Sequence, residues 1–176
     1  MMSDALINGS VHLEVELMKI KIYAIGKIKE NYLKIGIDDY LKKIKPYTQI
    51  EIVEVNDEPI PNNPNNSEIE IAKNKEGEKV LQLIKSGEYL IGLDLGKKEL
   101  ESPVFAEYLN KKMENAGASI SFVIGGSYGL SDELKNRCND SISLSKMTFL
   151  HQMTRLILLE QIYRAFKILR NETYHK

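Results

Sequence analysis

The sequence predicts an α/β domain with three layers, in which a mostly parallel sheet lies between two layers of helices. From residue 18 onward, strand-like and helix-like segments alternate five times with short loops between them. Residues 89–95 (YLIGLDL) and 119–124 (SISFVI) are nearly continuous apolar runs, which are typical of strands covered on both faces. The length of 176 residues suits one domain with a sizeable core.

The first elements follow from the spacing of apolar residues. Residues 19–25 (KIKIYAI) predict a strand, which Gly26 ends. Residues 30–44 carry apolar side chains at the spacing of one helix face. Residues 49–55 (QIEIVEV) alternate apolar and polar side chains, so we expect a half-buried or edge strand there.

An exposed loop and a charged helix come next. Residues 56–66 hold three prolines and five asparagines, which predicts a surface loop. Ser67 and Glu70 have the spacing of a capping box, so we expect a helix from there to about Lys85.

The second half of the chain continues the alternation. Ser102 and Pro103 predict a helix start, with serine as the N-cap and proline in the first turn. A short helix begins at Ser131, a short strand covers 141–145, and a last helix covers about 150–170.

The first 17 residues differ from the remainder. They contain three acidic residues and no Lys or Arg, so the positive start of a signal peptide is missing. We expect Met18 to be the functional start and residues 18–176 to form the single domain. Residues 1–17 are then an upstream extension or a leader foreign to the protein.

The net charge of −1 conceals an uneven distribution. Taken over the whole chain, a balanced charge argues against a nucleic-acid partner. From residue 146 onward, however, six Lys and Arg oppose two Glu, a local charge of +4. Tyr163, Phe166 and Tyr174 are interleaved there, which is compatible with RNA contact and base stacking. The alternative is a frayed, solvated chain end.

Composition also narrows the location and the cofactors. A single cysteine, Cys138, cannot form an internal disulfide, so a reducing cytoplasm fits best. No apolar run approaches the roughly 20 residues that cross a bilayer, so we expect no membrane partner. The three histidines are scattered without ligand spacing, so we expect no metal.

Motifs that could carry chemistry gather in the last third. A P-loop and a GxGxxG motif after the first strand are both missing. Gly125-Gly126-Ser127-Tyr128-Gly129 follows a buried strand, where glycines let the backbone approach a ligand, although an ordinary turn explains them equally well. Leu144 to Phe149 (LSKMTF) joins a strand end to a helix start, a place where ligands dock.

The last helix is apolar almost all round, so it is either buried centrally or shared with a second subunit. His151 and Arg155 share one face at its start. Substrate binding by Arg155 and a structural ion pair, for example to Glu160 of a neighbouring chain, carry equal weight.

The segments FVIGGSYGL and SLSKMTFLHQMTRLILLEQIYRAFKILRNETYHK closely resemble the RlmH (YbeA-type) family of SPOUT methyltransferases. The start MKIKIYAIGKIKENYLKIGIDDYLKKIKPY resembles that family too, so the resemblance covers essentially the whole chain after residue 17. Leu150 stands where the family pattern has Pro, a change that removes no proposed catalytic group.

This resemblance implies S-adenosylmethionine-dependent methylation of N3 of a pseudouridine in 23S ribosomal RNA. The implied substrate is the assembled ribosome, at a large-subunit stem-loop on the subunit interface. The implied fold is a homodimer whose carboxy-terminal part forms a trefoil knot. Carried over by position, the cofactor contacts fall on eight residues: Leu93, Gly125, Leu144, Ser145, Lys146, Met147, Thr148 and Phe149.

Loss of the N3 proton requires a proton acceptor or a group that stabilises the resulting anion. We expect Arg155 and His175 to be catalytic, with Tyr174 stacking on or orienting the target, whereas His151 is as well suited to brace its helix. The resemblance implies that the carboxyl end reaches the target from the partner subunit. Two alternatives remain open: a ribosome-binding or assembly factor without catalysis, and a SPOUT methyltransferase that acts on tRNA.

Overall fold

The computed structural model describes residues 18–116 and 119–174 of the chain. Its centre is a five-stranded sheet in the order β2-β1-β4-β3-β5, and all neighbouring strands run parallel. The strands are β1 (Lys19–Ile25), β2 (Gln49–Val55), β3 (Tyr89–Glu99), β4 (Ser119–Ile124) and β5 (Asp140–Ser143). The predicted sheet is confirmed, and β2 is an edge strand as its alternating pattern indicated.

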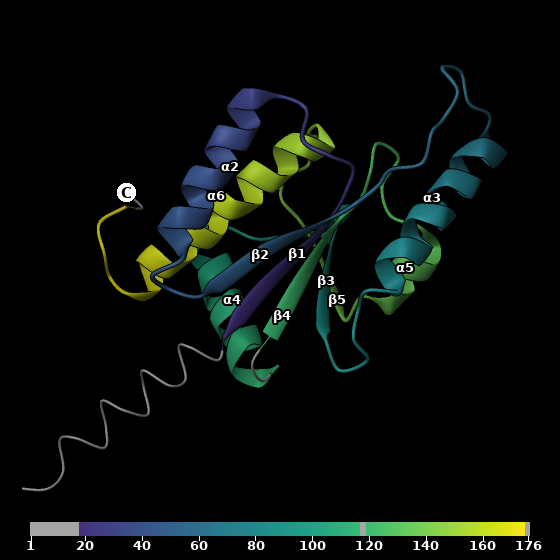
Figure 1. Ribbon diagram of the computed structural model, residues 1–176. Coiled ribbons are helices and arrows are strands. Elements are labelled where there is room, and N and C mark those ends of the chain that lie inside the picture. The colour runs from purple at the N-terminus through teal and green to yellow at the C-terminus, as the bar shows by residue number, and fades with distance from the viewer. Residues whose placement is uncertain (1–17, 117–118, 175–176) are drawn as a thin grey trace, which may run out of the picture.

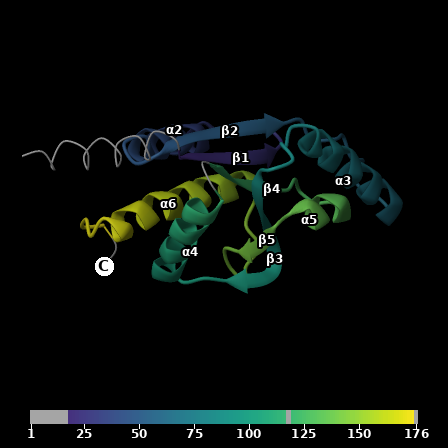
Figure 2. The same ribbon diagram turned by 90° about the horizontal axis from the view of Figure 1, so that it is seen from below.

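Helices cover both faces of the sheet (Figures 1 and 2). One face carries α2 (Asn31–Ile44), α4 (Ser102–Asn115) and α6 (His151–Leu169), and the other carries α3 (Asn66–Leu81) and α5 (Asp132–Arg137). The three-layer α/β/α prediction is therefore confirmed.

Each face of the sheet has its own hydrophobic core. Because side chains of a strand point alternately to opposite faces, Ile20 and Ile22 of β1 pack with α2, α4 and α6. Tyr23 and Ile25 pack on the other side, with Val80 of α3 and Leu134 of α5. Helix α6 lies in the larger core, against α2 and α4, with Leu158, Leu159 and Ile162 fully buried.

Two predicted helix starts were wrong by one or two residues. Helix α3 is capped by Asn65, whose side chain accepts from the Glu68 amide, while the Glu68 carboxylate accepts from the Asn65 amide. This pair has the same spacing as Ser67 and Glu70, so the pattern fitted two registers. Ser102 lies within α4 instead of capping it, and its hydroxyl donates to Gln161 of α6 at 2.7 Å.

The parallel strands place all their carboxyl ends at one edge of the sheet. The segments that follow β3, β4 and β5 therefore meet there, together with the start of α6. Ligands of open parallel sheets bind at this kind of edge.

Candidate active site

A cavity of about 660 Å³ opens at the carboxyl edge of the sheet. Three segments line it, those after β3, β4 and β5, together with the first turn of α6. Seven of the eight predicted cofactor residues lie on its wall: Leu93, Gly125, Leu144, Ser145, Met147, Thr148 and Phe149. Lys146 is exposed to solvent and is not part of the lining.

A tight glycine turn forms one wall. The Gly129 amide donates to the Gly126 carbonyl at 3.1 Å, and Gly129 has a φ of +84°, which favours glycine. A Cβ on Gly125 would lie 2.5 Å from the carbonyl carbon of Gly129, so any side chain there forces the turn apart. Glycine at these positions therefore permits the tight turn, whose residues 125–129 all line the cavity.

The loop after β5 contributes the apolar side chains of Leu144, Met147, Phe149 and Leu150 to the cavity. Met147 is 73% exposed and Leu150 is 56% exposed, an unusual position for large apolar side chains. The loop that carries them is shaped by Ser145, whose hydroxyl accepts from the Met147 amide at 3.0 Å. An apolar slot beside open backbone groups suits a flat heteroaromatic ring such as adenine.

A buried carboxylate supports the glycine turn from behind. Glu76 of α3 is only 5% exposed, and its Oε2 lies 3.1 Å from where a Cβ on Gly126 would be. Its Oε1 accepts from the Glu58 amide at 2.9 Å. Burial raises the pKa of this carboxyl above its usual range. Sequence reasoning missed Glu76 because it stands in a charged helix among other acids, and nothing local distinguishes it.

Two kinds of ionisable group line the cavity on the remaining sides. Asp94 and Lys135 form an ion pair with 3.5 Å between carboxylate and ammonium. His151 lies at the start of α6, and burial together with the Arg155 charge lowers the pKa of its ring below the usual 6.5.

Arg155 is buried, with only 1% of its side chain exposed. Its guanidinium donates to the Glu54 carboxylate at 2.7 Å and to the backbone carbonyls of Ile25 and Gly26. The structure therefore favours the structural alternative for this residue over substrate contact. Its ion-pair partner within the chain is Glu54, whereas Glu160 of the same chain pairs with Arg164 at 2.6 Å.

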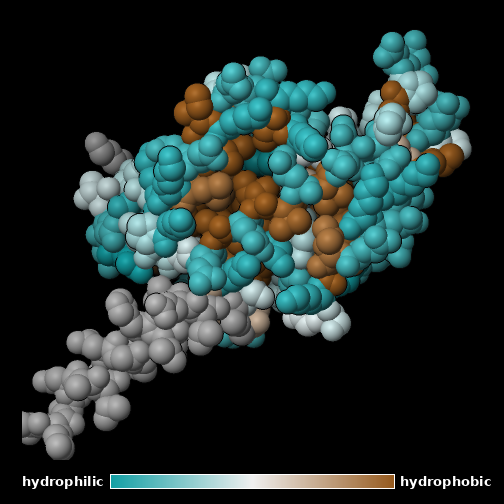
Figure 3. Space-filling view, viewed as in Figure 1, coloured by the Kyte–Doolittle hydropathy of each residue, from teal (hydrophilic) through white to brown (hydrophobic). Residues whose placement is uncertain are grey.

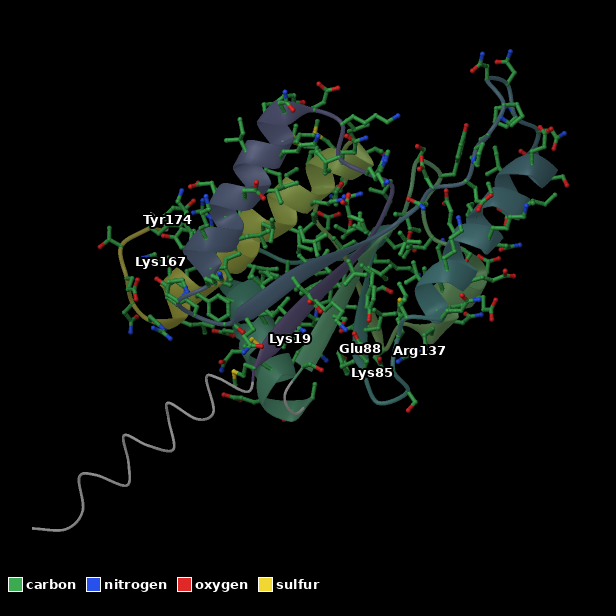
Figure 4. All side chains as sticks on the ribbon, in the orientation of Figure 1. Lys19, Lys85, Glu88, Arg137, Lys167 and Tyr174 are labelled. Carbon is green, nitrogen blue, oxygen red and sulfur yellow. The ribbon has the colours of Figure 1, made fainter. Side chains whose placement is uncertain are left out.

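Tyr174 lies far from the cavity of its own chain. The Tyr174 ring packs on Tyr163 with 4.9 Å between ring centroids, and its hydroxyl is 3.2 Å from Glu160. These residues are nine to twelve positions along α6 from His151, so roughly 14–18 Å separates them along the helix axis. Figure 4 shows Tyr174 and Lys167 at that far end. His175, a predicted catalytic residue, lies outside the described residues.

The predicted basic and aromatic strip contacts both itself and the ring of Tyr47, which follows α2. Lys167 pairs with Glu172 at 2.6 Å, and the Arg170 guanidinium lies 4.7 Å from the centre of the Tyr47 ring. Phe166 stacks on the same ring with 5.4 Å between centroids. In one subunit these groups therefore order the carboxyl end against α2 and α6.

A second cavity, of about 360 Å³, lies at the opposite edge of the sheet. Its central carboxylate, Glu88, accepts from Tyr23, from Ser121 and from the Lys85 amide. Figure 4 shows Glu88 and Lys85 near Arg137, which donates to the Glu88 carbonyl at 2.9 Å. These hydrogen bonds engage the carboxylate and the carbonyl of Glu88. None of the predicted site residues lines this second cavity.

Within residues 18–116 and 119–174, no cluster of three or more His, Cys, Asp or Glu side chains is placed to hold a metal ion. Over the same residues, no helix is both long and apolar enough to cross a membrane.

A parallel α/β sheet with a glycine turn and an apolar slot at its carboxyl edge is typical of proteins that bind a small cofactor there. Comparison with known proteins identifies which class this is. Residues 18–175 match the family described as "Predicted SPOUT methyltransferase", and the chain belongs to that family. The resemblance seen in the sequence is thereby confirmed.

One similar curated protein is the ribosomal RNA large subunit methyltransferase H of Carboxydothermus hydrogenoformans. It is 48% identical over 159 residues, which cover 90% of this chain and 100% of the relative. Among solved structures, a Legionella pneumophila methyltransferase with bound SAM matches at 11% identity and a TM-score of 0.48. That match covers 84% of this chain and 66% of the other.

Proposed function

We propose that this protein methylates N3 of a pseudouridine in 23S ribosomal RNA, with S-adenosylmethionine as methyl donor and the assembled ribosome as substrate. One observation carries the proposal. The glycine turn and the Leu144 to Phe149 loop enclose a cofactor-sized cavity in a chain that is 48% identical to a ribosomal RNA methyltransferase along that relative's whole length.

The residues present fit this cofactor. The adenine ring would lie between the apolar side chains of Leu144, Met147 and Phe149 and the open backbone of the glycine turn. When bound, S-adenosylmethionine supplies an electrophilic methyl group on its sulfonium. Leu93, Ser145 and Thr148 complete the wall, while exposed Lys146 is better placed to meet RNA phosphate than cofactor.

The geometry suggests that the active unit is a homodimer. Tyr174 packs at the far end of α6 from its own cavity, so it reaches a cavity only if that cavity belongs to a second subunit. Exposed apolar side chains on α2, Tyr32 at 59% and Ile35 at 70%, are suited to an interface. Figure 3 shows apolar surface gathered over β2 and the neighbouring helices α2 and α6.

The same proposal includes the threading and the location of the protein. The chain passes from the edge strand β5 to α6, which packs between α2 and α4, and we expect this passage to form the trefoil knot of the family. A cytoplasmic location follows from the substrate, because assembled bacterial-type ribosomes are found there.

Transfer of label from S-adenosylmethionine tests the proposal. We expect the methyl label to enter assembled ribosomes and to be absent from purified tRNA, and nuclease digestion to place it on N3-methylpseudouridine. Label in tRNA alone would point to the tRNA alternative. Cofactor binding without any transfer would support a factor that has the fold but no catalysis.

The pocket assignment is tested with a matched pair of glycine variants. Gly125→Val should reduce cofactor affinity by 100-fold or more, because the added side chain collides with the Gly129 backbone. Gly87→Val is the control, since a Cβ there has no atom within 4 Å. Calorimetry on variants that keep the far-ultraviolet spectrum of the wild type measures both, and undiminished binding by Gly125→Val would refute the assignment.

A further inference from the structure

The cavity is lined by one imidazole ring, and no residue in the described parts of the chain forms a hydrogen bond with that ring. His151 is the first residue of α6 and lines the cavity. Its ring is half-buried, and no residue within 18–116 or 119–174 forms a hydrogen bond with it. Asp94 and Lys135 also line the cavity, and they form an ion pair with each other. His151 therefore has ring nitrogens available to a bound molecule.

The surroundings of His151 keep the ring neutral. Arg155 lies one turn further along the same helix, and Lys29 approaches from the segment after β1. The positive end of the α6 dipole acts in the same direction. Asp57, in the segment after β2, opposes them, but burial and the two cations outweigh it, so the pKa of His151 is lowered. A neutral imidazole near pH 7 can accept a proton.

The position of the ring is held by the backbone around it. Its Nε2 lies 3.4 Å from where a Cβ on Gly26 would be, and Asp57 Cγ lies 3.9 Å from the same point. Arg155 bonds the carbonyls of Ile25 and Gly26, which ties the first turn of α6 to the end of β1. The buried arginine one turn away thus holds the start of α6, which carries His151, against the end of β1 at the cavity wall.

We infer that His151 is the base that receives the N3 proton of the target nucleotide during methyl transfer, an inference that rests on the proposed function. The N3 nitrogen forms a bond to the methyl carbon as the carbon–sulfur bond breaks, and that electron pair stays on sulfur to leave S-adenosylhomocysteine. The N3 proton passes to a ring nitrogen of His151 and then to water. Arg155 is then a positioning residue for His151, because its guanidinium is buried.

Replacement by glutamine separates this role from cofactor binding. His151→Gln keeps a polar side chain of similar reach but cannot take up a proton. We expect single-turnover methylation of ribosomes to slow by about 100-fold or more at pH 7, while cofactor affinity changes less than about threefold. His175→Gln is measured in the same assays for comparison, because His175 is the other histidine predicted to be catalytic. A His151→Gln rate within threefold of wild type overturns the inference, and an equal loss of cofactor affinity reassigns His151 to cofactor binding.

The pH dependence supplies a second readout. The wild-type rate should fall only below the usual histidine pKa of 6.5, as His151 becomes protonated, and the residual rate of His151→Gln should lack that fall. A fall that persists unchanged in His151→Gln contradicts the inference.

A titration without catalysis distinguishes the two proposals. The ring signals of the histidines, assigned by their loss in His151→Gln, are followed by NMR with and without S-adenosylhomocysteine. We expect the His151 signals to titrate below 6.5 and to shift on binding. Wild type that binds cofactor but methylates no RNA overturns the proposed function, whereas a His151 signal unaffected by the ligand overturns this inference.

Discussion

At the scale of single residues, Arg155 shows how burial determines what a charge does. An arginine four residues after a histidine in a cofactor-proximal helix is a reasonable catalytic candidate. In the fold its guanidinium is instead enclosed and donates to Glu54 and to two carbonyls at the end of β1. These bonds fix the start of α6 relative to the sheet, and with it one wall of the cavity.

Arg155→Ala should lower the free energy of unfolding by about 2–4 kcal/mol, because it leaves two buried carbonyls without a donor. Urea denaturation measures the loss. Lys43→Ala, which removes an exposed ion pair with Asp39 within α2, should cost less than about 1 kcal/mol. If Arg155→Ala were as stable as wild type and merely inactive, the structural role would be wrong.

Glu76 affects the free energy of unfolding by an amount that depends on pH. Burial raises the pKa of the Glu76 carboxyl in the folded state. As pH rises from about 4.5, the carboxyl therefore ionises in the unfolded chain before it ionises in the folded one. The folded state loses stability over that pH range. Glu76→Gln keeps an acceptor oxygen for the Glu58 amide but carries no charge.

We therefore expect Glu76→Gln to be more stable than wild type at neutral pH, with an advantage that disappears as pH is lowered toward 4.5. Urea denaturation between pH 4.5 and 7.5 measures the difference. Glu78→Gln, an exposed position on the same helix, controls for the change of charge alone. An advantage that does not vary with pH would show that Glu76 is ionised equally easily in both states.

At the scale of elements, the contact between α3 and α5 determines where the glycine turn is supported. Gly77 lies in the middle of α3, where sequence patterns indicate only an interruption. A Cβ there would collide with the side chain of Ser131, the N-cap of α5. The glycine lets the two helices approach closely, and the neighbouring Glu76 is thereby held behind Gly126.

Gly77→Ala should destabilise the protein by about 1–3 kcal/mol, although alanine normally stabilises a helix relative to glycine. Gly36→Ala in α2 is the control, because its Cβ would meet only the flexible end of Leu156, and we expect a change within about 1 kcal/mol. Thermal unfolding compares the two. A stabilised Gly77→Ala would mean that α3 and α5 separate without cost.

At the scale of the whole molecule, the cavity and the carboxyl end of one chain lie at opposite ends of α6. If the carboxyl end acts in catalysis, it therefore acts on a second subunit. Two inactive variants should complement each other: Gly125→Val, with a blocked cavity, and a chain that ends at residue 172, without Tyr174 and His175.

Mixed in equal amounts and allowed to exchange subunits, they should recover about a quarter of wild-type activity. Half of the dimers are then mixed, and each mixed dimer has one complete site of two. Native mass spectrometry verifies that mixed dimers form. Mixed dimers without activity would show that each carboxyl end serves its own cavity or none.

The sequence alone determined the layers, the parallel strands and the edge of the sheet at which the cavity opens. These follow from local patterns, since burial on both faces needs continuous apolar runs and parallel strands place their following loops at one edge. Seven of the eight residues that the family resemblance assigned to cofactor contact lie on the wall of the cavity at that edge. Lys146 does not, although Ser145 and Met147 on either side of it line the cavity.

Only the tertiary structure decided which polar and charged side chains are accessible to a ligand and which bond to other groups within the fold. Arg155 is enclosed by backbone from β1 and a carboxylate from β2, about 100 or more residues away in sequence. Tyr174 is held at the far end of its own helix, and Glu76 reaches the glycine turn from another layer. Residue identity and spacing contain no information on solvent access or on partners that are distant in the chain. Solvent access and such partners decide whether a titratable group supports the fold or takes part in a reaction.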